Sequence, residues 1–178
     1  KTTAARVFAK ALNCERGTED GPRPCNVCPT CEQITAGADM DVLEIDAATY
    51  SKVEQVRELA ESLKYGPAND RYKIVVLDEV HRLSRQAFDA LLKIVEEPPP
   101  RLVFIFATTE IRKVPVTVLS RCQRFDLKRI EPEVMIALLR KIAEAEGAAI
   151  GDDALALITR AAEGSARDAT SLLDQAIS

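Results

Sequence analysis

The sequence predicts an α/β protein with a parallel sheet covered by helices on both faces, followed by a small domain of helices alone. Strand-like apolar runs alternate with amphipathic helical segments over most of the 178 residues. Two of these runs, 72–79 and 102–109, are almost continuously apolar, as in strands buried on both faces of a parallel sheet. Only helical patterns follow Arg129. We therefore expect domains at 1–129 and 130–178.

The composition is typical of a soluble globular protein, with 47% hydrophobic and 29% charged residues. The apolar runs are too short to cross a bilayer, so no membrane partner is expected. The net charge of −4 argues against a globally basic surface that coats nucleic acid, although a local basic patch is compatible with it. Five cysteines, an odd number, argue against a secreted disulfide scaffold and favour a reducing, cytoplasmic location.

Local signals place the first elements. A helical repeat of apolar side chains runs through residues 3–13, and a polar stretch rich in glycine and proline follows. The branched apolar run at 41–48 predicts a strand. Ser51 and Glu54 form a capping box for the next helix. The expected apolar faces are Ala4, Val7, Phe8, Ala11 and Leu12 in the first helix, and Val53, Val56, Leu59 and Leu63 in the second.

The later elements have equally local signals. The strand at 72–79 leads to a helix that Ser84 caps and that the prolines at 98–100 end. The strand at 102–109 follows, and residues 122–127 are expected to form a further, shorter strand-like element. In the helical domain, the expected helix starts are Pro132, Asp152 and Ser165 with Asp168, and the expected stops are Gly147 and Gly164.

Four cysteines between positions 14 and 31 have the spacing C-x10-C-x2-C-x2-C. Three thiolates can reach one point from a single tight turn, and the fourth comes from the end of the first helix. Four thiolates around one ion are typical of a structural zinc site. An iron–sulfur cluster also takes four cysteines, and unligated buried thiols are the plainest alternative. The expected zinc ligands are Cys14, Cys25, Cys28 and Cys31; Cys122 is expected to be an ordinary buried thiol.

Two segments together indicate a nucleotide site. "KTT", which is Lys1, Thr2 and Thr3, matches the end of a phosphate-binding loop, where the lysine reaches the β- and γ-phosphates and the hydroxyl holds Mg²⁺. The strand "IVVLDE" ends in Asp78 and Glu79, which suit a Mg²⁺ ligand and a residue that orients the attacking water. Taken separately, "KTT" could be an arbitrary helix start, and Asp78 and Glu79 could be ordinary solvated acids after a strand.

Further motifs complete a family pattern. Thr108 and Thr109 end the next strand, where neutral hydroxyls could sense the γ-phosphate or simply terminate the strand. The segments "LDEVH", "LLKIVEEPP", "ATT", "LSRC" and "GSARDA" follow in order, together with the four-cysteine insert. Over essentially its whole length the chain resembles the ATPases of bacterial clamp loaders, members of the AAA+ family. The resemblance implies a P-loop NTPase fold and a helical lid at 130–178.

The resemblance also implies segments outside the sequence and roles for single residues. A strand and a glycine-rich half-loop, G-x-x-G-x-G, would precede Lys1, and a helical collar domain would follow Ser178. Thr109 would be the first sensor of the nucleotide. Arg121 of "SRC" would be an arginine finger for a neighbouring subunit, and Arg167 of "GSARDA" the second sensor. A surface salt bridge is the simple alternative for each arginine.

For DNA, the resemblance implies helix starts that follow the backbone of a primer–template duplex. Tyr50 stands where a basic residue is expected, and a solvated charged face is the alternative for the whole set. His81 is expected to pack near the acids without chemistry of its own. The candidate DNA contacts are Ser51, Lys52, Arg57 and Lys93.

The implied function is that of an ATP-hydrolysing motor, with Mg²⁺ as cofactor, which loads the sliding clamp onto primed DNA within the DNA polymerase III holoenzyme. Its expected partners are other clamp-loader subunits, the clamp and primer–template DNA. One alternative is a clamp-loader subunit that does not hydrolyse ATP; Lys1, Thr2, Asp78 and Glu79 argue against it. Another is a free-standing zinc module that binds DNA, but the cysteine segment lacks a basic, aromatic surface.

Overall fold

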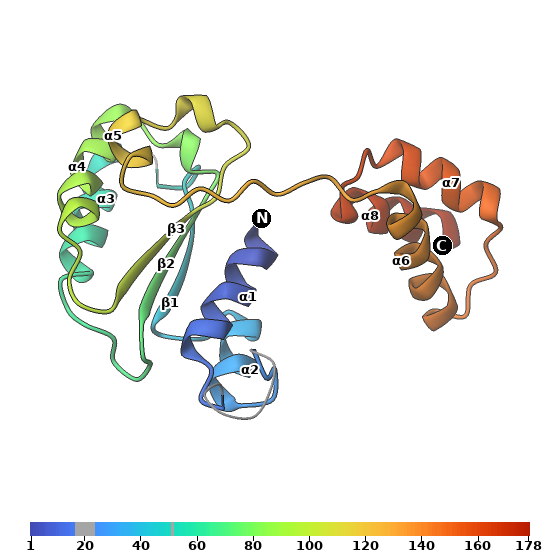
Figure 1. Ribbon diagram of the computed structural model, residues 1–178, viewed down its shortest axis with the longest axis horizontal. Helices are drawn as coiled ribbons and strands as arrows, with labels where there is room; N and C mark the ends of the chain where they lie inside the picture. Colours follow the sequence, from blue (N-terminus) through green and yellow to red (C-terminus); the bar gives the residue numbers. More distant parts are fainter. Residues whose placement is uncertain (17–23, 51) are drawn as a thin grey trace. The chain divides into compact units, whose positions relative to one another are not determined.

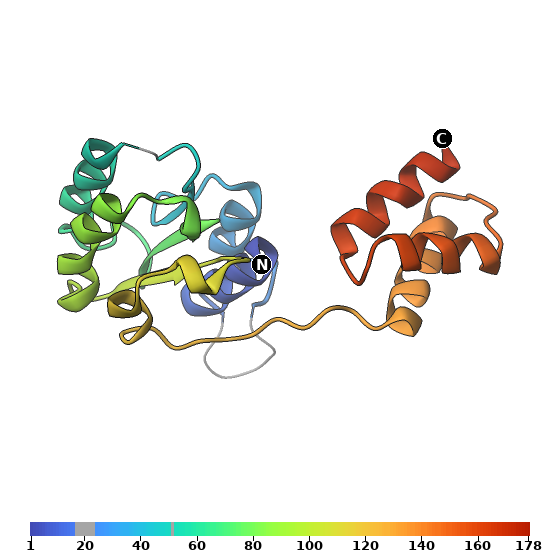
Figure 2. The same cartoon turned by 90° about the horizontal axis from the view of Figure 1, so that it is seen from above.

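Figures 1 and 2 show the computed structural model of the chain, which describes residues 1–16, 24–50 and 52–178. Contacts divide the chain into two compact units, Lys1–Arg124 and Phe125–Ser178, and each is described by itself. This division falls a few residues before the predicted limit at 129/130. In the ranges that the structure describes, no helix is long and apolar enough to cross a membrane.

The first unit is built on a parallel sheet of three strands, β1 (Val42–Asp46), β2 (Lys73–Asp78) and β3 (Leu102–Phe106), in the order β1-β2-β3. The central strand β2 pairs with both neighbours, so that Asp46 and Asp78 lie opposite each other at the carboxyl edge. Ile74–Leu77 are at most 1% exposed, which explains why this strand has no polar alternation. The three strands were predicted correctly.

Helices cover both faces of the sheet (Figure 1). α1 (Thr2–Asn13) and α2 (Pro29–Ala36) pack on one face, against Ile74 and Val76 of β2. α3 (Val53–Ser62) and α4 (Arg85–Glu96) pack on the other, against Val75 and Leu77. Successive side chains of a strand point to opposite faces, so one strand supplies both cores. The predicted three-layer arrangement is confirmed.

The predicted apolar face of α1 is largely wrong, although Leu12 does pack against the core as expected. The helix buries Ala5, Ala9 and Asn13, whereas Val7 and Phe8 are 46% and 50% exposed. Small alanine side chains allow the helix to lie close to the sheet, and Asn13 is buried because its side chain bonds the chain at Tyr72, accepting from the backbone N–H and donating to the carbonyl. α2, a helix that was not predicted, begins after Cys28 with Pro29 at its first position and ends at Gly37 in the left-handed conformation.

The helices on the opposite face begin with different caps. α3 begins after Lys52, whose backbone N–H donates to Oε1 of Gln55. The predicted capping box joins Glu54 to Ser51. Ser51 lies outside the described residues. The buried face of α3 is as predicted, and so is the cap of α4, where Ser84 Oγ accepts from the Ala87 N–H.

The expected strand-like element at 122–127 is wrong. The described sheet ends at β3, and residues 122–127 have no strand conformation. Phe125 and Leu127 are 74% and 62% exposed, so apolar composition alone misled the prediction. Between β2 and this segment the chain also forms three short elements that were not predicted: η1 (Val80–Arg82), η2 (Ile111–Lys113) and α5 (Val116–Leu119).

The second unit consists of α6 (Pro132–Ala145), α7 (Asp152–Ala161) and α8 (Ala166–Ile177), with starts as predicted. Met135, Leu139, Leu155 and Leu173 form its core. Gly164 has φ +77°, and a Cβ there would lie 2.8 Å from Cβ of Arg129. Its carbonyl accepts from the Ile130 N–H, so this glycine lets the entering chain pass close to the α7–α8 turn.

Candidate active site and metal centre

The carboxyl end of β2 presents the two predicted acids. Asp78 is the last residue of the strand, and one of its carboxylate oxygens accepts from the Glu79 N–H. Glu79 has φ +49° and ψ +40°, a left-handed conformation that is uncommon for a residue with a side chain. Val80 then donates its N–H to the Ala107 carbonyl beyond β3. The left-handed turn therefore directs the Glu79 carboxylate away from the strand axis while the backbone stays tied to the sheet.

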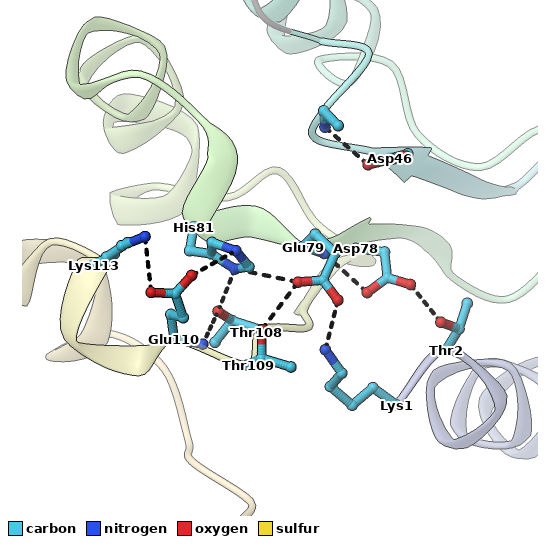
Figure 3. Close-up of polar contacts among 11 residues, drawn as sticks. Lys1, Thr2, Asp46, Asp78, Glu79, His81, Thr108, Thr109, Glu110 and Lys113 are labelled. Carbon is cyan, nitrogen blue, oxygen red and sulfur yellow. Dashed lines mark hydrogen bonds and ion pairs between the residues drawn. The ribbon is translucent and has the colours of Figure 1, made fainter. Parts of the chain in front are cut away.

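The start of α1 lies beside these acids (Figure 3). Thr2 Oγ1 donates to Oδ2 of Asp78, and Nζ of Lys1 lies 2.8 Å from Oε1 of Glu79. The paired residues are separated by 76 and 78 positions in the sequence. The fold thus brings the two halves of the predicted nucleotide site together.

This arrangement offers the groups that a Mg²⁺–nucleotide site needs. The first N–H groups of an α-helix have no acceptor within the helix, so the amides at Thr2 and Thr3 suit a phosphate. The ammonium of Lys1 adds a full positive charge. The Thr2 hydroxyl and the Asp78 carboxylate are hard oxygen ligands that suit Mg²⁺.

The segment after β3 contributes two threonines with different contacts. Thr109, the residue that the resemblance implied as the first sensor, donates from Oγ1 to Oε2 of Glu79 at 3.3 Å. Thr108 Oγ1 accepts from the Glu110 N–H and lies 2.9 Å from Nδ1 of His81. Thr108 therefore stabilises the conformation of residues 108–110, while Thr109 contacts Glu79 in the candidate site.

Sequence reasoning missed the polar role of His81 and Glu110. The His81 side chain is only 8% exposed, with Nδ1 3.3 Å from Oε2 of Glu79 and Nε2 3.3 Å from Oε1 of Glu110. Lys113 pairs with Glu110 at 2.8 Å, and this hydrogen bond lowers the pKa of the Glu110 carboxyl. The position of His81 three residues after Asp78 was the available signal, but nothing local marked Glu110 as its partner.

The two predicted arginines lie in different units. Arg121 follows α5, where its guanidinium lies 2.8 Å from Oε1 of Glu96 and donates to the Thr117 carbonyl at 2.7 Å. Arg167 is exposed in the first turn of α8, in the second unit. Arg121 is thus held by its own chain at the last turn of α4.

The candidate DNA contacts do not all lie at helix starts. Lys52 caps α3 and Arg57 is exposed farther along the same helix. Lys93 is exposed in the last turn of α4, away from the helix start where the resemblance implied a contact. Arg85, the first residue of α4, is an exposed basic residue at a helix start that the prediction missed, although it directly follows the Ser84 cap.

The four clustered cysteines come together as predicted. Their Sγ atoms all lie within 4.8 Å of one another, and Cys14, Cys28 and Cys31 are buried. Tetrahedral zinc with Zn–S bonds of about 2.3 Å needs sulfurs roughly 3.8 Å apart, which this cluster fits. Burial raises the pKa of the Cys31 thiol to about 12. A metal would hold this sulfur as a thiolate, because a coordinated thiol loses its proton.

Polar side chains next to the cysteines tie the cluster to the sheet. Asn13, which precedes Cys14, donates to Oδ2 of Asp70 at 2.7 Å and to the Tyr72 carbonyl just before β2. Thr30, between Cys28 and Cys31, donates to Oε1 of Glu15.

The fifth cysteine, Cys122, is partly buried against the first core, where burial raises the pKa of its thiol.

Comparison with known proteins identifies the family. Residues 1–131 match the family described as DNA polymerase III, delta subunit, and residues 136–178 match the DNA polymerase III clamp loader subunit, ATPase lid domain. The chain is 49% identical over 178 residues to DNA polymerase III subunit tau of Bacillus subtilis and 50% identical over 177 residues to that of Escherichia coli. The two alignments cover 100% and 99% of this chain, but only 31% and 27% of the length of the two relatives.

A shorter relative supports the same family, and two solved structures have a similar fold. DNA polymerase III subunit gamma of Buchnera aphidicola is 45% identical over the whole chain, which spans 48% of that relative. A DNA polymerase III gamma subunit-related protein of Thermotoga maritima aligns with 97% of this chain and 57% of its own, at TM-score 0.55 and 22% identity. The RuvB Holliday junction branch migration motor of the same organism aligns with 97% and 56%, at TM-score 0.62 and 18% identity. The chain therefore belongs to the tau/gamma family of bacterial DNA polymerase III, the AAA+ clamp-loader ATPases.

Proposed function

We propose that the chain is the ATP-binding and ATP-hydrolysing part of a clamp-loader motor subunit. The observation that carries the proposal is the convergence of Lys1 and Thr2 with Glu79 and Asp78 through two direct side-chain contacts. The relatives, at 45–50% identity, carry the names of DNA polymerase III subunits tau and gamma. A loader would open the sliding clamp, place it on primed DNA and use hydrolysis to let go.

Each residue of the site has its own role in the proposed reaction. Lys1 and the first amides of α1 bind the phosphates, and Thr2 with Asp78 holds Mg²⁺. Bound Mg·ATP would supply the phosphoryl group that is transferred. Glu79 orients the attacking water and accepts its proton, because its carboxylate lies at the strand end in contact with Lys1 and Thr109. Thr109 and Arg167 act as sensors of the nucleotide, and Arg121 serves the site of a neighbouring subunit.

Zinc in this proposal is structural. Four cysteine ligands leave no open position for catalysis. The ion would hold the end of α1 to the start of α2, next to the Asn13 contact with the sheet. Lys52, Arg57 and Lys93, with Ser51 and the newly found Arg85, remain candidates for contact with the primer–template backbone. Other loader subunits, the sliding clamp and DNA are the proposed partners, in the cytoplasm.

The test uses the full-length protein assembled with its partner subunits, with primed DNA and clamp present. ATP turnover and clamp loading are measured for the parent, Lys1→Ala and Asp78→Asn. Both variants should lose clamp loading, and Lys1→Ala should also lose nucleotide binding. A non-hydrolysing structural subunit is the alternative, and it would be favoured if an assembly with Lys1→Ala in every copy of this subunit loaded clamps at the parent rate.

A further inference from the structure

His81 is enclosed between two acids. It is the only histidine in the sequence, and its ring lies between Glu79 and Glu110 with 8% of the side chain exposed (Figure 3). Each ring nitrogen has a carboxylate oxygen 3.3 Å away, and Nδ1 is also within hydrogen-bond distance of Thr108 Oγ1. A nearly buried ring with polar partners on both edges has an orientation fixed by its contacts.

The segment after β3 contacts both nitrogens of the ring, Thr108 at Nδ1 and Glu110 at Nε2. Thr108 Oγ1 lies 2.9 Å from Nδ1 of His81 and also accepts from the Glu110 N–H at 2.9 Å. Glu110 Oε2 binds Lys113 Nζ at 2.8 Å, and the Lys113 N–H donates to the Glu110 carbonyl. The two residues of this segment that contact the ring are therefore connected to one another and to η2.

The Nδ1 edge of the ring also faces the acid that the proposed chemistry needs, Glu79. Oε1 of Glu79 is bound to Lys1, and Oε2 lies 3.3 Å from both Thr109 Oγ1 and His81 Nδ1. A phosphate at Lys1 would compete with Glu79 for the ammonium. The contacts that would then orient the carboxylate are those of Thr109 and His81.

We propose that His81 is a positioning residue for Glu79, and that through Glu110 it couples the orientation of this carboxylate to the segment 110–113. This inference rests on the proposed function, because it assigns His81 a role only through Glu79. It differs from a packing role in requiring ring nitrogens at both edges.

The test compares variants that keep or remove these nitrogens in the full-length protein with its partner subunits. His81→Phe keeps a ring of similar size but no polar edge, whereas His81→Asn places an amide near the former Nδ1. We expect His81→Phe to lower kcat for ATP hydrolysis about 10-fold or more, as loss of an outer-shell partner does. Affinity for a non-hydrolysable ATP analogue should stay within about twofold of the parent. His81→Asn should recover part of the lost rate.

A second readout needs no nucleotide. Amide hydrogen exchange of the unmodified and variant proteins should show faster exchange at residues 108–113 in His81→Phe, because the Glu110 N–H depends on Thr108. Lys64→Ala, which breaks the exposed pair with Glu61 on α3, is the control and should change neither readout.

The outcomes separate the inference from the proposed function. Parent-like hydrolysis in Glu79→Gln would overturn the proposed function, whatever His81 does. If Glu79→Gln is inactive but His81→Phe keeps the parent kcat, the positioning role is wrong and the function stands. Equal losses in His81→Phe and His81→Asn, with analogue affinity falling in parallel, would show that His81 is needed only for packing.

Discussion

The ammonium of Lys1 lies 2.8 Å from Oε1 of Glu79, so the proposed phosphate ligand and the proposed water-orienting acid bind each other. The two side chains are 29% and 34% exposed, and such partly exposed ion pairs are worth up to about 1 kcal/mol. This is small beside the interactions that a triphosphate offers. A phosphate of a bound nucleotide can therefore replace Glu79 as the partner of Lys1 at little cost in free energy.

The first prediction concerns Glu79→Gln, which weakens this pair without changing the size of the side chain. Nucleotide affinity should stay the same or rise by up to about fivefold, because about 1 kcal/mol of competing attraction is removed. ATP hydrolysis should collapse, because the amide cannot accept a proton from water. Equilibrium binding of a fluorescent nucleotide and single-turnover hydrolysis measure the two effects separately.

Lys1→Ala is the matched comparison and should weaken binding itself. Reduced affinity in Glu79→Gln would mean that this carboxylate helps to bind the nucleotide, contrary to the role assigned to it. The Asp78 carboxylate remains in both variants, so the proposed Mg²⁺ ligand is unchanged.

The second prediction concerns Cys28→Ser, which removes one buried ligand from the cysteine cluster. Structural zinc contributes on the order of 10 kcal/mol in small modules, and we expect less here because α1 and α2 also pack on the sheet. The variant should lose zinc. Its backbone amides at residues 24–36 should exchange hydrogen faster than in the parent, while the amides of β2 should stay protected. Cys122→Ser, outside the cluster, should keep its zinc.

Metal analysis checks the premise of that prediction. The parent protein should contain one zinc ion per chain. Iron with the visible absorption of a cluster, or reduced thiols with substantially less than one zinc, would contradict the assignment.

The third prediction concerns Asp70, because burial and then the charges of Asp39 and Asp41 raise the pKa of its carboxyl to about 6. The folded protein therefore binds a proton more readily than the unfolded chain between about pH 4 and pH 6. The contribution of Asp70 to stability is fully present below this window and is lost as the pH rises through it. Asp70→Asn should remove this dependence, measured as the urea midpoint against pH.

Asp41 gives the opposite sign and serves as the control. Burial favours its protonated form, but three backbone N–H groups, those of Ala68, Asn69 and Asp70, bond the carboxylate and lower its pKa. Its contribution is present at neutral pH and lost as the pH falls. Asp41→Asn should therefore lower the urea midpoint at pH 7.5, whereas Asp70→Asn should leave it unchanged or raise it.

The sequence was sufficient to predict features that depend on local chemistry. The continuous apolar run of β2 placed Asp78 and Glu79 at a strand end, and the cysteine spacing gathered four thiols. The face of α1 was wrong because an apolar stripe does not reveal that the small side chains of Ala5 and Ala9 allow the closest approach to the sheet. The His81–Glu110 contact joins two loops 29 positions apart, and no local pattern encodes it.

The fourth prediction concerns Arg121, whose guanidinium lies 2.8 Å from Oε1 of Glu96 at the last turn of α4. α4 begins shortly after Glu79 and has 12 residues, so its last turn lies about 17 Å along the helix from the end near Glu79. An arginine held there cannot act on the site of its own chain without a large movement. We therefore expect Arg121 to act on the nucleotide of a neighbouring subunit.

An arginine finger stabilises the charge that spreads over the γ-phosphoryl oxygens, and it is worth about 10³–10⁵ in rate. The exposed pair with Glu96 is worth about 1 kcal/mol at most, so it can be exchanged for a phosphate. Arg121→Ala should leave nucleotide binding in its own chain intact and lower hydrolysis at the adjacent site by about 10³-fold or more. Glu96→Gln, the control for the pair itself, should change the rate by no more than about fivefold.

The decisive measurement uses a loader in which two copies of this subunit occupy known adjacent positions. One copy carries Arg121→Ala and the other Lys1→Ala, and the two arrangements differ only in their order. Where the intact Arg121 faces the intact Lys1 site, hydrolysis at that interface should be preserved; in the reverse order it should be lost. Equal activity in the two orders would mean that Arg121 acts within its own chain or only binds Glu96.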